Sequence, residues 1–169
     1  MEEGMVLKGK AHVFGHDINT DYIISGKYKF KTLDMDELAR HCMEDIDPEF
    51  TSRVQPGDFI VAGANFGCGS SREQAPLVIK HAGISAVLAK SFARIFFRNA
   101  INNGLPVAEC DTSGIQSGDQ LEVDLEAGMV VNLTQGTELA VTPLPPVMMD
   151  ILKEGGLAAY LKKHGGFKL

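Results

Sequence analysis

The chain is short of cysteines and has no long apolar run, and both shortages exclude whole classes of protein. Its three cysteines, Cys42, Cys68 and Cys110, are an odd number without close spacing. This argues against a disulfide framework and against a Cys-x-x-Cys metal site. No apolar run reaches the about 18–20 residues that a membrane-spanning helix needs, and residues 1–4 are acidic rather than typical of a signal peptide. We therefore expect reduced thiols and a cytoplasmic protein.

Positive charge is also scarce. There are 16 lysines and arginines against 22 aspartates and glutamates, which gives a net charge of −6. Proteins that bind nucleic acid or a membrane surface usually carry a basic patch, so these partners are not expected. A chain of 169 residues is long enough for one domain with a real core. Without a repeat or a low-complexity linker, we expect residues 1–169 to form a single domain.

The middle of the chain predicts a parallel sheet covered by helices. Apolar runs at 59–62, 84–89 and 105–108 are typical of buried strands, and helical patterns at 77–81 and 91–102 separate them. Strands that alternate with helices indicate parallel pairing. The sequence therefore predicts an α/β fold.

The first part of the chain is less regular. Residues 6–14 indicate a first strand, and 22–24 fit either a short buried strand or a turn of helix. The lysine-rich stretch 25–32 has neither period and predicts a mobile surface loop. Residues 34–44 have a helical pattern with acidic residues in the first turn.

The last third changes character. Residues 119–125 and 129–133 alternate between apolar and polar, and a third short run at 139–141 follows. We expect a small antiparallel meander packed on the α/β part. Two helices, near 147–153 and 157–163, are expected to end the chain.

Residues 65–76, Asn-Phe-Gly-Cys-Gly-Ser-Ser-Arg-Glu-Gln-Ala-Pro, lie between an apolar strand and an apolar helix. Gly67 and Gly69 suit a tight turn, because glycine accepts positive φ and lets other groups come close. Ser70 and Glu73 have the spacing of a capping box at a helix start. Unpaired N–H groups at such a start favour negative charge.

Several functions fit this turn on residues alone. Arg72 is a planar donor suited to carboxylates, and the hydroxyls of Ser70 and Ser71 could abstract a proton if their charged form were stabilised. Arg72 also replaces the third glycine of a dinucleotide motif, and the G-x-S-x-G elbow of serine hydrolases is absent. A capped helix without catalysis stays open as an alternative.

A resemblance narrows these alternatives. Residues 65–76 resemble the signature of the swivelling domain of the aconitase superfamily, in particular the separate small subunits of 3-isopropylmalate dehydratase and homoaconitase. Two more stretches, 19–23 and 91–99, agree with that family in the same order along the chain. The resemblance covers nearly the whole chain and implies a swivelling β/β/α domain with a partly parallel sheet, flanking helices and a small antiparallel meander.

The resemblance also implies a divided enzyme. Such a chain would be the small subunit of a hydro-lyase that interconverts 2-isopropylmalate and 3-isopropylmalate in leucine biosynthesis. The [4Fe-4S] cluster would belong to a separate large subunit, and this chain would bind no metal. The alternatives are a small subunit of homoaconitase or of a hydratase for dimethylmalate or another methyl-substituted malate, and a small-anion-binding module without catalysis.

The family's site residues map onto matching positions of this chain. By resemblance, Ser70 is the catalytic base, and Ser71 and Arg72 bind a substrate carboxylate. Gly67 and Gly69 are expected to support the site, and Asp21 either orients a site residue or caps the turn that follows it. For Cys68 we expect no more than a small side chain in a tight turn. Arg94 either points to the site or pairs with surface acids.

The family's specificity loop corresponds to residues 27–32. Several relatives carry Tyr-Leu-Arg-Thr or Tyr-Leu-Val there, whereas this chain has Tyr-Lys-Phe-Lys-Thr from Tyr28 to Thr32. Lys31 can attract a distal carboxylate as a point charge, and Tyr28 and Phe30 can cover an isopropyl group. By resemblance Tyr28, Lys31 and Thr32 contact the substrate, and the loop leaves the substrate's identity open.

Overall fold

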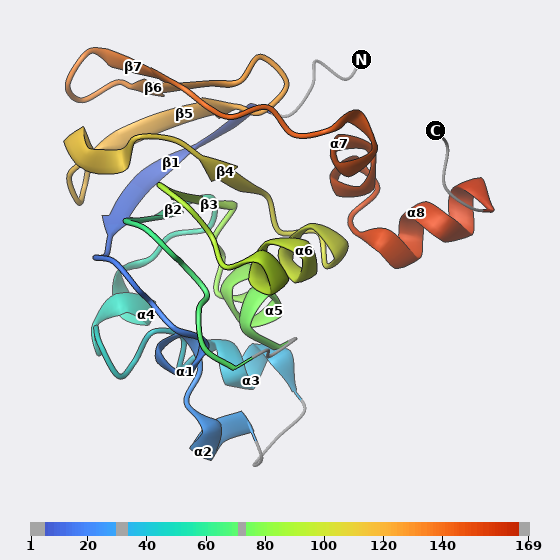
Figure 1. Ribbon diagram of the computed structural model, residues 1–169. Helices are drawn as coiled ribbons and strands as arrows, with labels where there is room; N and C mark the ends of the chain where they lie inside the picture. The colour runs from blue at the N-terminus through green and yellow to red at the C-terminus, as the bar shows by residue number, and fades with distance from the viewer. Residues whose placement is uncertain (1–5, 30–33, 71–73, 166–169) are drawn as a thin grey trace.

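A single seven-stranded sheet organises the computed structural model, which describes residues 6–29, 34–70 and 74–165 (Figure 1). The strand order is β4-β3-β2-β1-β5-β6-β7. The strands are β1 Val6–Val13, β2 Phe59–Ala62, β3 Ala86–Ala89, β4 Val107–Glu109, β5 Gln120–Asp124, β6 Met129–Asn132 and β7 Thr137–Ala140. No helix among the described ranges is long and apolar enough to cross a membrane.

The parallel half of the sheet confirms the expected α/β fold. Strands β1, β2, β3 and β4 pair in parallel, with Val13 beside Val61 and Val61 beside Leu88. Helix α5 (Gln74–His81) connects β2 to β3, and α6 (Arg94–Asn102) connects β3 to β4. The carboxyl ends of the parallel strands therefore meet at one edge of the sheet, where ligands bind in open α/β sheets.

The antiparallel meander of the last third is attached to the parallel half through β1. Strand β5 pairs antiparallel with β1 along the register from Val6–Asp124 to Lys10–Gln120, and β6 and β7 follow as antiparallel neighbours. The three strands thus continue the sheet beyond β1, and their buried side chains also pack on one face of its parallel half, as expected. The early residues of β1 hydrogen-bond to β5 while the later ones reach β2, so one strand serves both halves.

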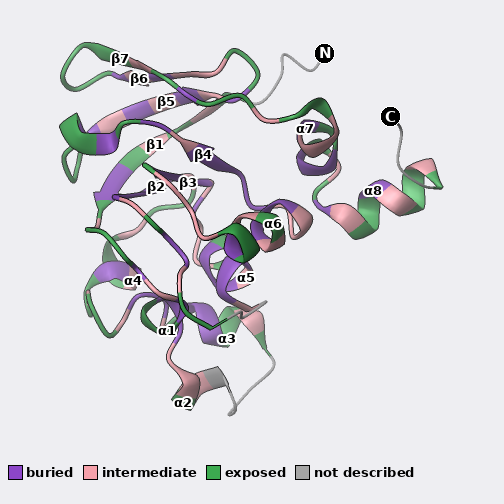
Figure 2. Cartoon of the chain, viewed as in Figure 1, coloured by how far each residue is buried: buried purple, intermediate pink, exposed green. Residues whose placement is uncertain are grey.

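Two apolar clusters lie on opposite faces of the sheet. In β2, Ile60 and Ala62 pack with the helices, whereas Phe59 and Val61 face the meander side. Because side chains alternate across a strand, both faces of β2 are covered and all four residues are buried. Figure 2 shows this as purple strands β2 and β3 in the middle of the fold. The continuous apolar run at 59–62 reflects burial on both faces.

Short helices fill the segment between β1 and β2. They are α1 Thr20–Ile23, α2 Gly26–Lys29, α3 Met35–Ala39 and α4 Phe50–Arg53. Residues 22–24 therefore fall in and just after a helical turn, and the expectation of a loop throughout 25–32 is wrong for α2. Residues 30–33 lie outside the described residues. Helix α3 is shorter than expected. After Ala39 the chain continues as turns, in which the N–H groups of His41 and Cys42 donate to carbonyls three residues earlier, and Met43 is left-handed with φ 61°.

The remaining helices lie close to their predicted places. Helix α6 begins at Arg94 rather than at Ser91, since residues 91–93 first run beside the turn after β2. Helices α7 (Pro146–Lys153) and α8 (Leu157–His164) end the described chain, and α7 starts with Pro146 in its first turn. Proline is tolerated there because its missing N–H would have no helical partner.

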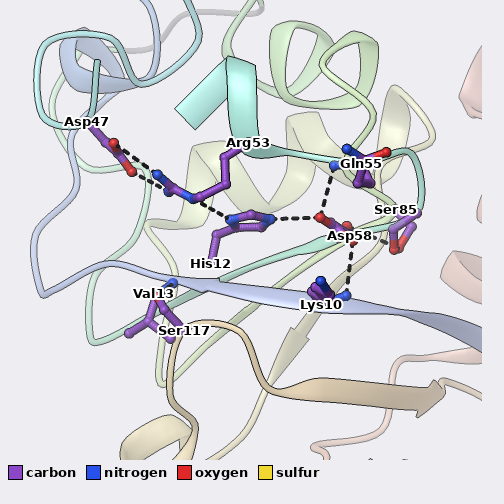
Figure 3. Close-up of polar contacts among 10 residues, drawn as sticks. Lys10, His12, Val13, Asp47, Arg53, Gln55, Asp58, Ser85 and Ser117 are labelled. Carbon is purple, nitrogen blue, oxygen red and sulfur yellow. Dashed lines mark hydrogen bonds and ion pairs between the residues drawn. The ribbon is translucent and has the colours of Figure 1, made fainter. Parts of the chain in front are cut away.

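A buried polar network ties β1 to the segment before β2 (Figure 3). The carboxylate of Asp58 accepts a 2.8 Å hydrogen bond from Nε2 of His12 and 3.0 Å bonds from the N–H groups of Lys10 and Gln55. The Nε of Arg53 donates to Nδ1 of His12 at 3.4 Å. Because arginine only donates, this contact assigns the histidine proton to Nε2, which then points at the carboxylate.

Candidate functional site

The turn that follows β2 is held by hydrogen bonds from two distant segments. The N–H of Gly67 donates to the carbonyl of Ile18 at 2.7 Å, and the N–H of Phe66 donates to the carbonyl of Ser91 at 3.0 Å. The side chain of Ser91 also accepts from the N–H of Asn65 at 2.8 Å. The turn is therefore fixed between the end of β1 and the end of β3, at the carboxyl edge of the parallel strands.

Both glycines of the turn are required by its geometry. Gly67 and Gly69 have φ values of 84° and 90°, which residues with a Cβ rarely adopt. A Cβ on Gly67 would collide with the ring of Phe96 in α6, and one on Gly69 would lie 3.2 Å from Cβ of Asn19. The turn thus packs directly against the start of α6 on one side and the start of α1 on the other.

Helix α1 fixes the backbone at Ser70. The hydroxyl of Thr20 donates to the carbonyl of Ser70 at 2.7 Å, and the N–H of Thr20 donates to the carbonyl of Cys68 at 3.0 Å. Thr20 is 2% exposed, so this hydroxyl is committed to the turn. The helix itself starts at the N-cap Asn19, whose side chain accepts from the N–H of Tyr22 at 3.1 Å. Ser70 remains exposed at the end of the turn.

A hollow of about 300 Å³ opens beside Ser70. It is bordered by the turn, by Thr20 and by residues of α6, including Arg94 at the start of the helix and Asn99 farther along it. The first N–H groups of a helix lack partners within the helix and carry partial positive charge. No described carboxylate forms an ion pair with Arg94. The hollow therefore combines a hydroxyl, a cation and a positive helix end, which suits a small carboxylate.

A second hollow, of about 240 Å³, adjoins the first across Arg94. Its walls are mostly apolar and come from Phe92, Phe97, Leu144 and Met148 among others. It holds no residue of the glycine-rich turn. The chemistry of the turn thus belongs to the hollow beside Ser70.

The structure brings together part of the predicted site. Ser70, Gly67 and Gly69 share the wall of one hollow, and Asp21 lies in the first turn of α1, directly after Thr20. The remaining predicted residues except Tyr28 lie outside the described residues: Lys31, Thr32, Ser71 and Arg72. Glu73 of the capping box also lies outside, and α5 is described from Gln74, with Pro76 in its first turn.

Tyr28 is described, and its side chain is engaged within the chain. Its hydroxyl donates to Oε2 of Glu44 at 2.7 Å, and its ring stacks on His41 with 3.7 Å between centroids. The hydrogen bond to the Glu44 carboxylate, together with burial, raises the pKa of Tyr28. The expected substrate contact of this residue thus competes with partners inside the protein.

The sequence did not predict that Thr20 holds Ser70. It also left open whether Arg94 points to the site or pairs with surface acids. Thr20 lies 50 residues before Ser70, and Arg94 lies in a different crossover. No local spacing links either of them to the turn. One signal could have found them: Thr20 lies in stretch 19–23 and Arg94 in stretch 91–99, the two stretches that accompany the glycine-rich motif in the family.

The cysteines are all free, and they differ in environment. Burial raises the pKa of the Cys42 thiol. Burial, with a smaller effect of Asp111, raises the pKa of Cys110 to about 11. Cys68 is half-buried in the turn beside Ser70. Across residues 6–29, 34–70 and 74–165, no three histidine, cysteine or acidic side chains gather in a way that could hold a metal ion.

Comparisons with known proteins show the family of the chain. Residues 18–110 match the model of the aconitase C-terminal domain family. The small subunit 2 of 3-isopropylmalate dehydratase from Archaeoglobus fulgidus is 61% identical over 98% of this chain and 100% of its own length. A small subunit of 3-isopropylmalate dehydratase from Caldicellulosiruptor bescii is 55% identical over 94% of this chain and 96% of its own length.

A solved structure is similar over nearly the same extent. The crystal structure of 3-isopropylmalate dehydratase from Methanocaldococcus jannaschii superposes with a TM-score of 0.92 at 50% identity, covering 95% of this chain and 96% of that one. The α/β fold with its mixed sheet is thereby confirmed. With the family model and the full-length relatives in agreement, the chain belongs to the aconitase C-terminal domain family and, within it, to the small subunits of the hydro-lyase 3-isopropylmalate dehydratase.

Proposed function

We propose that this chain supplies half of an active site that interconverts 2-isopropylmalate and 3-isopropylmalate by dehydration and rehydration. Its partner would be a large subunit, as the small-subunit names of its relatives suggest. The observation that supports the proposal most directly is Ser70, exposed at the end of a rigid glycine turn and facing a hollow that Arg94 borders. In this assembly Ser70 abstracts the proton next to a substrate carboxylate.

A serine can act as a base only if its alkoxide is stabilised, because its ordinary pKa is far above 7. Donors and cations that are fixed before the reaction provide such stabilisation. The positive end of α6 and the guanidinium of Arg94, both at the hollow beside Ser70, are two of these groups. Arg72, two residues after Ser70, would be a third and would hold a substrate carboxylate with Ser71. In the rehydration, Ser70 returns the proton to the carbon that had lost the hydroxide, and hydroxide adds to the carbon that had lost the proton.

The chain's own residues supply the base and the carboxylate contacts, whereas no cluster of histidine, cysteine and acidic side chains among the described residues could hold a metal to take a leaving hydroxide. A [4Fe-4S] cluster on the large subunit would supply that Lewis acid when bound. The substrate would lie between the two subunits, and the exposure of Ser70 permits such an arrangement. A cytoplasmic location belongs to the same proposal and agrees with three free thiols.

Reconstitution with a cognate, cluster-loaded large subunit tests the divided site. We expect no turnover from this chain alone and turnover from the pair. In the pair, Ser70→Ala should lower kcat by about a thousandfold, within the range known for general bases, while the substrate still binds. Ser71→Ala is the matched control, since it should raise KM more than it lowers kcat. A Ser70→Ala rate near wild type would rule out the base.

Homoaconitase and the substituted-malate hydratases differ from 3-isopropylmalate dehydratase in the distal group of their substrates. Lys31 favours such substrates if their distal group is a carboxylate. A panel of isopropylmalate, homoisocitrate and dimethylmalate on the reconstituted pair separates them, and Lys31→Met should lower the rank of the distal-carboxylate acids. A non-catalytic anion-binding module is the outcome if no large subunit restores turnover with any acid.

A further inference from the structure

Helix α2 lies apart from the sheet, below α1 and α3 (Figure 1). It has four residues, Gly26–Lys29, which is too short to be stable without contacts to the rest of the protein. The side chain of Tyr28 supplies these contacts. The Tyr28 hydroxyl donates to Oε2 of Glu44 at 2.7 Å. The ring lies parallel to that of His41, with an interplanar angle of 5°.

The three side chains close into a ring of contacts. Nδ1 of His41 lies 2.8 Å from Oε1 of Glu44, so the two carboxylate oxygens receive one donor each. A carboxylate only accepts, which assigns the His41 proton to Nδ1. The hydrogen bond from His41 and then that from Tyr28 lower the pKa of Glu44. We call Tyr28, His41 and Glu44 the α2 clamp.

The turns that carry His41 and Glu44 are themselves tied to the site. Met43, between them, is fully buried and left-handed with φ 61°. Its N–H donates to the carbonyl of Ile23, the last residue of α1, at 3.0 Å. A buried non-glycine residue at positive φ is uncommon and persists only when its surroundings hold it. The first residue of α1, Thr20, in turn holds the backbone of Ser70.

A second connection runs from the clamp to the Ser70 turn through the helices. The clamp follows α3, and α3 packs on α5, the helix that comes after the turn. Nδ1 of His81 in α5 lies 2.9 Å from Oδ1 of Asp36 in α3. The segment from α1 to α2 is thus held at both ends, by the bond from Thr20 to Ser70 at one and by the clamp to the turns after α3 at the other.

We propose that Tyr28, His41 and Glu44 are positioning residues. They hold α2 against the turns after α3 and thereby fix α1, whose first residue Thr20 borders the hollow beside Ser70. Tyr28 then acts through Glu44 and not by touching the substrate. This inference rests on the proposed function. It extends that function by assigning the fit of the substrate to a contact far from the glycine-rich turn.

Glu44→Gln tests the clamp, because the amide keeps the shape but turns one acceptor into a donor. Asp36→Asn is the matched control, since it alters a histidine–carboxylate pair that joins α3 to α5 and does not involve α2. In the whole chain, trypsin cleavage after Lys27 should be about fivefold faster in Glu44→Gln and unchanged in Asp36→Asn, as expected for losing a charged hydrogen bond. Tyr28→Phe keeps the stack and should show a smaller increase.

In the assembled enzyme, Glu44→Gln should raise KM for isopropylmalate about three- to tenfold with kcat within about twofold, since positioning contacts act on binding. Glu44→Asp should restore part of the wild-type KM. Should Glu44→Gln fail to assemble, Tyr28→Phe carries the same test. If trypsin cleavage is unchanged in both Glu44→Gln and Tyr28→Phe, the clamp is overturned. If cleavage is faster but KM is unchanged, the positioning role of the clamp is overturned. An active Ser70→Ala enzyme with a clamp-dependent KM would instead refute the proposed base alone.

Discussion

Thr20 and Ser70 are 50 residues apart in the sequence and joined by a 2.7 Å hydrogen bond, in which the threonine hydroxyl donates to the serine carbonyl. The bond holds the backbone of Ser70 while its side chain stays exposed. A general base must lie within hydrogen-bond reach of the proton that it removes. The position of the proposed base therefore depends on a residue from a different part of the chain.

Thr20→Val therefore tests whether the rate depends on the position of Ser70 and not only on its presence. The variant keeps the volume but loses the hydrogen bond, so we expect about 0.5–1.5 kcal/mol lower stability. We also expect about tenfold lower kcat in the reconstituted enzyme, because small misplacements of reacting groups are costly. Thr20→Ser restores the donor and should recover most of the rate. Equal kcat in Thr20→Val and wild type would show that this bond does not position Ser70.

Gly67→Ala should destabilise the chain through crowding as well as strain. The new Cβ would meet the ring of Phe96 at a positive φ of 84°. Gly118→Ala is the matched control, because Gly118 has a similar φ of 93° but no atom within 4 Å of such a Cβ. We expect a loss of about 1–2 kcal/mol for the control and about 1–3 kcal/mol more for Gly67→Ala. Urea unfolding of both variants measures the difference, and equal losses would contradict the close packing on α6.

The ionisation of Asp58 should make the free energy of unfolding depend on pH in the acid range. Burial alone would raise its pKa, but the hydrogen bonds from His12 and from two backbone N–H groups outweigh it, so the pKa of Asp58 is lowered. A lowered folded pKa means that the stabilisation is present above the unfolded value of about 3.9. It is lost as pH falls through the folded value.

Asp58→Asn should accordingly lower the free energy of unfolding by roughly 1–3 kcal/mol at pH 7. It should also flatten the dependence of that free energy on pH below about 4. Asp45→Asn, an exposed position, is the control and should leave both unchanged. Urea titrations from pH 7 to pH 2.5 give the comparison, and an unchanged acid slope in Asp58→Asn would refute the role of this carboxylate.

Cys68 should be the fastest thiol to react in the native chain. Cys42 is fully buried, and the pKa of Cys110 is about 11, so both are poor nucleophiles near pH 8. We expect mass spectrometry to find iodoacetamide first on Cys68, with the other two labelled only in denaturant. Binding of the large subunit and substrate should slow the reaction at Cys68. Early labelling of Cys42 would contradict the burial of the segment after α3.

The regular elements were largely predictable from the sequence because their signals are local. The run at 59–62 is buried on both faces, and the crossovers at α5 and α6 follow from the alternation of strand and helix patterns. The segment 25–29 was not predictable, since α2 is stabilised by contacts with His41 and Glu44 rather than by its own period. The attachment of the meander likewise depends on β1, which lies more than a hundred residues earlier.

The glycine-rich turn was determined by the sequence itself, because the conformations of Gly67 and Gly69 are open to few other residues. The family followed from the same turn. Only the tertiary structure decided which groups surround Ser70, since Thr20 and Arg94 reach it from other crossovers. Backbone preference acts over a few residues and can be read from spacing, whereas packing chooses partners by shape across the whole chain.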